Sequence, residues 1–121
     1  MVIRQGDVYW IDMDEPSGSE PGFLHPYVVI QNNAFNWSCI QTVVVCTLTS
    51  NLKAARAPGN VLLAKGEGNL PKRSVVNISQ ISTVDKGRLV RRIGNLSKVR
   101  MEEVIRGIHL LLRPVELEPR P

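Results

Sequence analysis

The sequence predicts a mainly β domain, a small curled antiparallel barrel with one helix packed on it. Short β-rich runs separated by turn residues follow one another closely from residue 7 to residue 84. Only near the C-terminus do apolar residues recur at intervals of three and four, the pattern of a helix with one buried face. With 121 residues, 43% of them hydrophobic, the chain is expected to form one domain over residues 1–121.

The first predicted strand, residues 8–13, follows the turn Gly6-Asp7. Residues 14–25 contain too many prolines and glycines for a regular element, so they are expected to form a long loop of the kind that often carries function. A second strand is expected at residues 26–31. Pro26 then takes the first strand position, where a missing N–H does least harm.

Further strands are expected from the β-branched runs that follow. Residues 33–37 fit an irregular turn or a single short helical turn, and residues 42–49 form a near-continuous apolar run typical of a buried central strand. Residues 60–64 and 73–78 are further β-rich runs. Residues 79–84 alternate polar and apolar side chains, as a half-exposed strand does.

The C-terminal segment is predicted to be an amphipathic helix, with Ser97 as its N-cap and Pro114 as its stop. His109 lies at the edge of the apolar stripe, where a structural role is the simpler interpretation. Residues 114–121 form a short Pro/Glu tail that is expected to be flexible. The stripe consists of Met101, Val104, Ile105, Ile108, Leu111 and Leu112.

The sequence favours a cytoplasmic protein, and because it has no cofactor-binding or zinc-binding motif, no cofactor is expected. The net charge of +4 slightly favours a polyanionic partner. No apolar stretch approaches the ~20 residues that span a bilayer, and no signal-peptide pattern is present. Cys39 and Cys46 lack metal-ligand spacing, and Cys46 is most simply a small buried hydrophobe. The acidic residues Asp12, Asp14 and Glu15 are better interpreted as a solvated turn than as a Mg²⁺ site.

Two strand ends carry the side chains of a candidate active site. His25 closes the long loop, and Thr49 and Ser50 end the buried strand, so the two can meet at the edge of a small sheet. Imidazole exchanges a proton near neutral pH, and a hydroxyl donates a hydrogen bond. This pair suits metal-free phosphodiester chemistry. The residues alone leave open a plain surface histidine and hydroxyls that only cap backbone groups.

Aromatic and basic residues in the same regions suit a nucleic acid, although each alone is ordinary surface. Phe23 and Trp37 offer faces for unpaired bases. Six basic residues are candidates for a phosphate track: Lys53, Arg56, Lys72, Arg73, Lys86 and Arg88.

Several short motifs, in order along the chain, resemble the MazF/PemK (Kid-like) toxins of bacterial type II toxin–antitoxin systems. The similarity is collinear over roughly residues 4–112. The motifs are Gly6-Asp7-Val8, Gly18-Ser19-Glu20, Pro26 with Val29-Ile30-Gln31-Asn32, Thr49-Ser50, Ser74-Val75, Gln80-Ile81 and Thr83-Val84-Asp85-Lys86-Gly87-Arg88-Leu89.

The resemblance implies an SH3-like barrel with a C-terminal helix, a homodimer, and a sequence-selective endoribonuclease that cleaves single-stranded RNA without a metal. It also implies a cognate antitoxin whose C-terminal tail occupies the RNA groove. Thr49 matches the family's catalytic threonine, and Ser50 beside it is a further candidate for holding the phosphate oxygens. Positions matching the family's RNA path are Ser19, Glu20, Asn32, Pro58, Ser74 and Gln80.

His25 departs from the family, which typically has an arginine before this proline. Arginine stabilises negative charge, whereas histidine is the better general base. The sequence therefore predicts that His25 removes the proton of the ribose 2′-hydroxyl and that Thr49 holds the phosphate oxygens. The alternatives are a non-catalytic toxin, such as a gyrase poison with the related CcdB barrel, or a degenerate homologue that only binds RNA or antitoxin.

Overall fold

The computed structural model describes residues 2–13, 24–115 and 117–119. Ser19, Glu20 and Phe23, together with Asp14 and Glu15, lie outside the described residues. The elements in chain order are β1 (Asp7–Asp12), β2 (Leu24–Val29), α1 (Asn33–Asn36), β3 (Thr42–Thr49), η1 (Leu52–Arg56), β4 (Val61–Leu63), η2 (Glu67–Asn69), β5 (Ser74–Asp85), η3 (Lys86–Arg88), β6 (Leu89–Asn95) and α2 (Lys98–Leu112).

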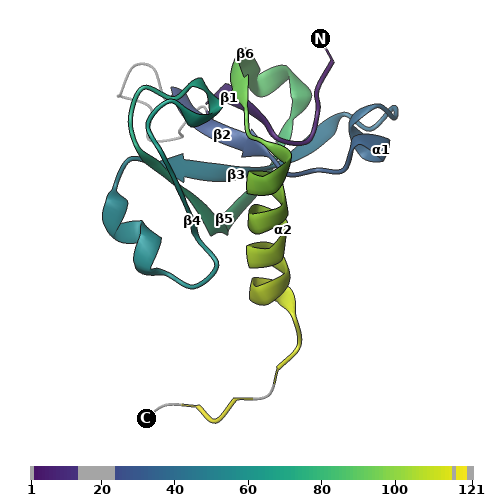
Figure 1. Ribbon diagram of the computed structural model, residues 1–121. Helices are drawn as coiled ribbons and strands as arrows, with labels where there is room; N and C mark the ends of the chain where they lie inside the picture. The colour runs from purple at the N-terminus through teal and green to yellow at the C-terminus, as the bar shows by residue number, and fades with distance from the viewer. Residues whose placement is uncertain (1, 14–23, 116, 120–121) are drawn as a thin grey trace.

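The six strands form one antiparallel sheet in the order β4-β5-β3-β2-β1-β6. This confirms the predicted mainly β fold with a C-terminal helix. The sheet is not closed, because its two end strands, β4 and β6, do not pair with each other. Helix α2 packs against one face of the sheet (Figure 1).

Apolar side chains are buried on both faces of the sheet. On the face under α2, Val28 and Cys46 pack with Val104 of the helix. On the opposite face, Tyr27 and Val45 pack in a second cluster. Because successive side chains of a strand point to opposite faces, β3 contributes to both clusters. Its burial on both sides explains the near-continuous apolar run of residues 42–49 and confirms that this run is the buried central strand.

Strand β5 combines two runs that the sequence separated, residues 73–78 and 79–84. Its register with β3 shifts between the pairs Cys46↔Ile81 and Thr47↔Asn77, which leaves residues 78–80 as a bulge. Such a bulge bends and twists a strand, so one long strand can follow a curled sheet.

The side chain of Asn60 holds this bulge in place. Its Oδ1 accepts a hydrogen bond from the buried N–H of Ile78 at 3.0 Å, and its Nδ2 donates to the carbonyl of Ala54 at 2.8 Å. Asn60 thus satisfies backbone groups that have no strand partner.

The sequence placed the start of β2 wrongly and missed β6. Strand β2 begins at Leu24, so Pro26 is its third residue and pairs with Trp10 of β1. The proline is tolerated because the ladder with β3 ends at Tyr27, which leaves Pro26 unpaired on that side. Strand β6 escaped prediction because exposed charged residues and bulges interrupt its apolar pattern.

Helix α2 confirms the predicted N-cap, because Ser97 Oγ accepts from the N–H of Arg100 at 3.1 Å. The Arg100 guanidinium donates to both carboxylate oxygens of Glu67 in η2, at 2.9 and 2.8 Å. These hydrogen bonds lower the pKa of Glu67 below its ordinary value.

The helix also meets the loop before β4 backbone to backbone. A Cβ at Gly107 would overlap the carbonyl oxygen of Gly59 and lie 3.1 Å from its carbonyl carbon. Only glycine permits this approach. Among the helices of the described chain, none combines the length and hydropathy that crossing a bilayer requires.

Candidate active site

The ends of β2 and β3 bring the two predicted catalytic residues into one cleft. The last pair of their antiparallel ladder at this end is Tyr27↔Thr47. Extending this register by two residues beyond the paired part brings His25 level with Thr49. Both side chains line a cleft of about 430 Å³. The sheet thus places an imidazole and a hydroxyl together, as the sequence predicted.

Thr49 presents its hydroxyl at the end of β3. Its Oγ1 accepts a hydrogen bond from the backbone N–H of Asn51 at 3.1 Å. The hydroxyl hydrogen remains available to donate, since accepting uses only an oxygen lone pair. Ser50 and Ser74 line the same cleft, and Ser74 donates its own hydroxyl to the carbonyl of Lys72 at 3.0 Å.

His25 is exposed at the start of β2, where its backbone pairs with Ile11 of β1. It lies outside the buried core, as the position after a Gly/Pro loop predicted. Apart from this histidine, the titratable side chain that lines the described part of the cleft is Lys72. The cleft therefore offers one imidazole, one ammonium and a group of hydroxyls.

Apolar side chains form another part of the cleft's lining, here called the apolar wall, and no local pattern in the sequence indicated that they belonged to a site. Trp10 belongs to β1, and the sequence predicts only that it is part of a strand. Its ring reaches the cleft because β1 pairs with β2 beside it, a contact that depends on register rather than on local sequence. The wall consists of Trp10, Leu24, Pro26, Leu48, Leu70 and Pro71.

The predicted RNA-path residues fall in different places. Ser74 lines the cleft, whereas Pro58 lies exposed after η1 and does not. Gln80 is exposed in the β5 bulge, where its carbonyl accepts from Thr47 Oγ1 at 3.3 Å, two residues before Thr49 on β3. Asn32 lies beyond the far end of β2, capping α1 through a bond to the N–H of Ala34.

Of the six basic residues proposed as a phosphate track, the structure brings one, Lys72, to the cleft. Lys53 and Arg56 lie on η1, just after Ser50. Lys86 is engaged elsewhere, donating to the carbonyl of Asn36 near α1 at 2.9 Å. Trp37, the other described aromatic candidate, lies just after α1, with its indole N–H donating to Ile3 O at 2.8 Å.

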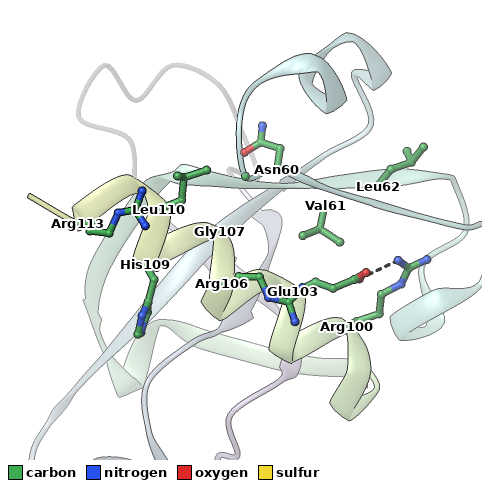
Figure 2. A pocket seen from close by; sticks show the side chains of 11 residues that line it. Asn60, Val61, Leu62, Arg100, Glu103, Arg106, Gly107, His109, Leu110 and Arg113 are labelled. Atoms are coloured by element: carbon green, nitrogen blue, oxygen red, sulfur yellow. Dashed lines mark hydrogen bonds and ion pairs between the residues drawn. The ribbon is translucent and has the colours of Figure 1, made fainter. Parts of the chain in front are cut away.

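A second, larger groove of about 730 Å³ lies between α2 and the segment 59–62. Figure 2 shows the Arg100–Glu103 ion pair at one end and Leu110 with Arg113 at the other. His109 borders this groove and is exposed at the edge of the helix, and its structural role stays a prediction. Its imidazole does not share a cleft with the hydroxyl of Thr49.

Cys46 behaves as the sequence predicted, as a small buried side chain. Its thiol donates to the carbonyl of Asn77 at 3.1 Å, and burial raises its pKa to about 12. Within the described part of the chain, no three His, Cys, Asp or Glu side chains group together as metal ligands.

Comparison of the sequence with known protein families identifies the class to which this fold and cleft belong. Residues 4–112 match the family described as PemK-like, MazF-like toxin of type II toxin-antitoxin system. This match covers most of the chain. The chain therefore belongs to the PemK/MazF toxin family.

Two individual proteins of this family are similar to the chain over nearly its whole length. The chain is 41% identical over 112 residues to Endoribonuclease MazF6 of Mycobacterium tuberculosis, covering 93% of this chain and 98% of that protein. It is 38% identical over 111 residues to Endoribonuclease MazF of Staphylococcus saprophyticus, covering 92% of each.

Solved structures share the fold at lower identity. A MazE-MazF crystal structure from Deinococcus radiodurans superposes with a TM-score of 0.77 at 23% identity, over 93% of this chain and 96% of that one. A mycobacterial endoribonuclease in complex with its cognate antitoxin gives a TM-score of 0.74 at 23% identity, over 94% and 99%.

Proposed function

We propose that this protein is the toxin of a type II toxin–antitoxin system and a metal-independent, sequence-selective endoribonuclease that cleaves single-stranded RNA. The observation that carries the proposal is the shared cleft of His25 and Thr49. Relatives named endoribonucleases, at 41% and 38% identity over nearly the whole chain, support the reaction class.

The cleft offers the groups that cleavage by the ribose 2′-hydroxyl requires. His25 takes the proton of the 2′-hydroxyl, whose oxygen forms a bond to the adjacent phosphorus. The bond from phosphorus to the 5′-oxygen breaks, and that oxygen takes a proton from solvent water. The products are a 2′,3′-cyclic phosphate and a free 5′-hydroxyl. Because the nucleophile is a 2′-hydroxyl, DNA is not a substrate.

Thr49 stabilises the charge that develops on the non-bridging oxygens. With Oγ1 already accepting from Asn51, the hydroxyl hydrogen is its remaining group for binding an oxyanion. The neighbouring Ser50 hydroxyl supplies a second donor in the same cleft. Donors of this kind typically contribute about 2.7–4 kcal/mol each to catalysis.

The apolar wall of the cleft supports a preference for single strands. Unpaired bases stack on aromatic side chains, and Trp10 presents an indole within the cleft. Ser74 and Gln80, together with Asn32, Pro58, Ser19 and Glu20, are proposed to extend the RNA path beyond the cleft.

Incubation with a long single-stranded RNA in EDTA tests the proposal. We expect cleavage by the wild type, a cyclic phosphate on the upstream product, and strongly reduced cleavage by His25→Ala and Thr49→Ala. Substituting deoxyribose at the cleaved nucleotide should block the reaction, since the nucleophile is then missing. Absence of cleavage by both the wild type and His25→Arg would refute the nuclease assignment.

The histidine at the family's arginine position supports one alternative function, RNA or antitoxin binding without cleavage. In that case the wild type would be inactive while His25→Arg cleaves strongly. If His25 is the base, the rate must instead fall in acid, where imidazoles become protonated. A rate that rises steadily to about pH 10 contradicts the histidine base.

The partners implied by the family complete the proposal. We propose a cytoplasmic homodimer that is neutralised by an antitoxin whose C-terminal tail lies in the RNA groove. Added antitoxin should therefore compete with RNA for the cleft. Light scattering over a range of protein concentrations measures the oligomeric state.

A further inference from the structure

We infer that Lys72 supplies the positive charge that stabilises the reacting phosphate, a role that position 25 cannot fill while its histidine acts as a base. This inference rests on the proposed endoribonuclease function. It concerns one described side chain that lines the same cleft as His25, Thr49 and Ser50.

The chemistry of the cleft requires such a charge. Attack by the 2′-oxygen increases the negative charge on the phosphate oxygens, and a nearby cation stabilises that charge. A histidine that acts as a base starts the reaction neutral, because only the neutral ring accepts a proton. The hydroxyls of Thr49 and Ser50 donate hydrogen bonds but carry no charge. Among the described residues that line the cleft, Lys72 is the one with an amino group in its side chain.

The backbone around Lys72 is anchored at the rim of the cleft. On one side, Leu70 is 3% exposed in the main core and Pro71 has a restricted φ. On the other side, the hydroxyl of the buried Ser74 donates to the carbonyl of Lys72 at 3.0 Å. The base of the side chain therefore has a defined position, while its flexible stem lets the ammonium follow a phosphate.

The ammonium of Lys72 is not used by the part of the fold that the structure describes. Within the described chain it makes no hydrogen bond and no ion pair. In contrast, Lys86 and Arg100 are bound to the carbonyl of Asn36 and to Glu67, respectively. An exposed, unpaired cation beside a candidate catalytic pair is available to bind a substrate anion.

Single-turnover cleavage of a long single-stranded RNA in EDTA tests the inference, with Lys72→Gln as the variant. Lys65→Gln is the matched control, since Lys65 is also exposed in a turn but does not line the cleft. We expect Lys72→Gln to lower the rate about 10²- to 10³-fold, as removal of one charge-stabilising group does elsewhere. Lys65→Gln should change it only a few-fold, and Lys72→Arg should restore most of the activity.

Introducing Lys72→Gln into the His25→Arg variant tests whether the charge of Lys72 is needed because position 25 holds a histidine. If the introduced guanidinium then supplies the charge, Lys72→Gln should cost at least tenfold less in this background than in the wild type. Equal losses in both backgrounds would overturn the inference, as would equal rates for Lys72→Gln and Lys65→Gln. Urea unfolding of both single variants checks that each is folded.

Failure of the proposed function gives a different result from failure of this inference. If the wild type does not cleave RNA but His25→Arg does, Lys72 does not supply the missing charge and the inference is wrong. If neither protein cleaves, the nuclease function itself is refuted. If the wild type cleaves and Lys72→Gln matches Lys65→Gln, only the role of Lys72 is refuted.

Discussion

Replacing Thr49 by valine removes one hydroxyl and keeps the branched shape, so it isolates the chemistry of this residue. The hydroxyl has two separable roles. Its oxygen accepts the N–H of Asn51 at 3.1 Å in the folded protein, and its hydrogen is proposed to bind the phosphate. The first role affects the free energy of unfolding, and the second affects the rate of cleavage.

The stability cost should be small. Thr49 is only partly buried and Asn51 is exposed, so water replaces the lost hydrogen bond and the cost is about 0.5–1 kcal/mol. For a chain of 121 residues, an unfolding entropy of about 2.1 cal/mol/K per residue turns this cost into a decrease in Tm of roughly 2–4 °C. A protein with a typical stability of about 5–15 kcal/mol stays folded at 25 °C after such a loss.

The effect on the rate should be much larger. Loss of one oxyanion donor costs about 2.7–4 kcal/mol of transition-state stabilisation, or about 10²- to 10³-fold in the single-turnover rate. Because the folded fraction barely changes, unfolding cannot account for this decrease. Thr49→Ser, which keeps the hydroxyl, should retain activity within about tenfold.

Thr47→Val is the matched control. Thr47 lies on the same face of β3 and also makes one hydroxyl hydrogen bond, to Gln80 O at 3.3 Å, but it does not line the cleft. Its Tm should fall by a similar amount while its cleavage rate stays within a few-fold of wild type. The role of Thr49 is refuted if Thr49→Val keeps more than about a tenth of the wild-type rate.

Three further predictions concern the scaffold that holds the cleft, each measured by urea unfolding at fixed protein concentration. Gly107→Ala should destabilise the protein by about 1–3 kcal/mol beyond the ~1 kcal/mol gained in helix propensity, because its Cβ overlaps the carbonyl oxygen of Gly59. Glu67→Gln should cost about 0.5–1.5 kcal/mol at pH 7, because it removes the charge and one of the two oxygens that accept from the partly exposed Arg100. Asn60→Ala should cost about 1–3 kcal/mol, because it leaves a buried N–H of the β5 bulge without a partner.

The Glu67 prediction has a definite pH dependence. Arg100 lowers the pKa of this carboxyl in the folded protein below its ordinary value of 4.5. Its contribution is therefore complete above pH 4.5 and is lost as the pH falls through the lowered folded pKa. The stability difference between wild type and Glu67→Gln should shrink in acid, and a difference independent of pH would contradict the ion pair.

Gly66→Ala is the control for Gly107→Ala, and Ser79→Ala is the control for Asn60→Ala. A Cβ at Gly66 would meet no atom within 4 Å, so its substitution costs only backbone strain from the positive φ of +93°. Ser79 lies exposed in the same bulge as Ile78, whose N–H donates to Asn60. If Asn60→Ala is no more destabilising than Ser79→Ala, the bulge does not depend on the Asn60 side chain.

The sequence predicted most of the secondary structure because local patterns encode it. The β-branched run of residues 42–49 became β3 over those residues, and Ser97 caps α2 as expected. The prediction failed where the local sequence pattern does not match the structure that tertiary pairing produces. Strand β6 is an edge strand that carries the exposed residues Arg91 and Arg92, so it lacks a clear apolar pattern. It is a strand because it pairs with β1.

The sequence by itself determined which chemical groups this protein has and that two of them, an imidazole at residue 25 and a hydroxyl at residue 49, lie near strand ends. The ordered motifs also determined its family. Only the tertiary structure decided that these groups share one cleft with Trp10 and Lys72. The reason is physical: the neighbours of a strand end depend on the register between strands distant in sequence, and burial across the whole sheet sets that register.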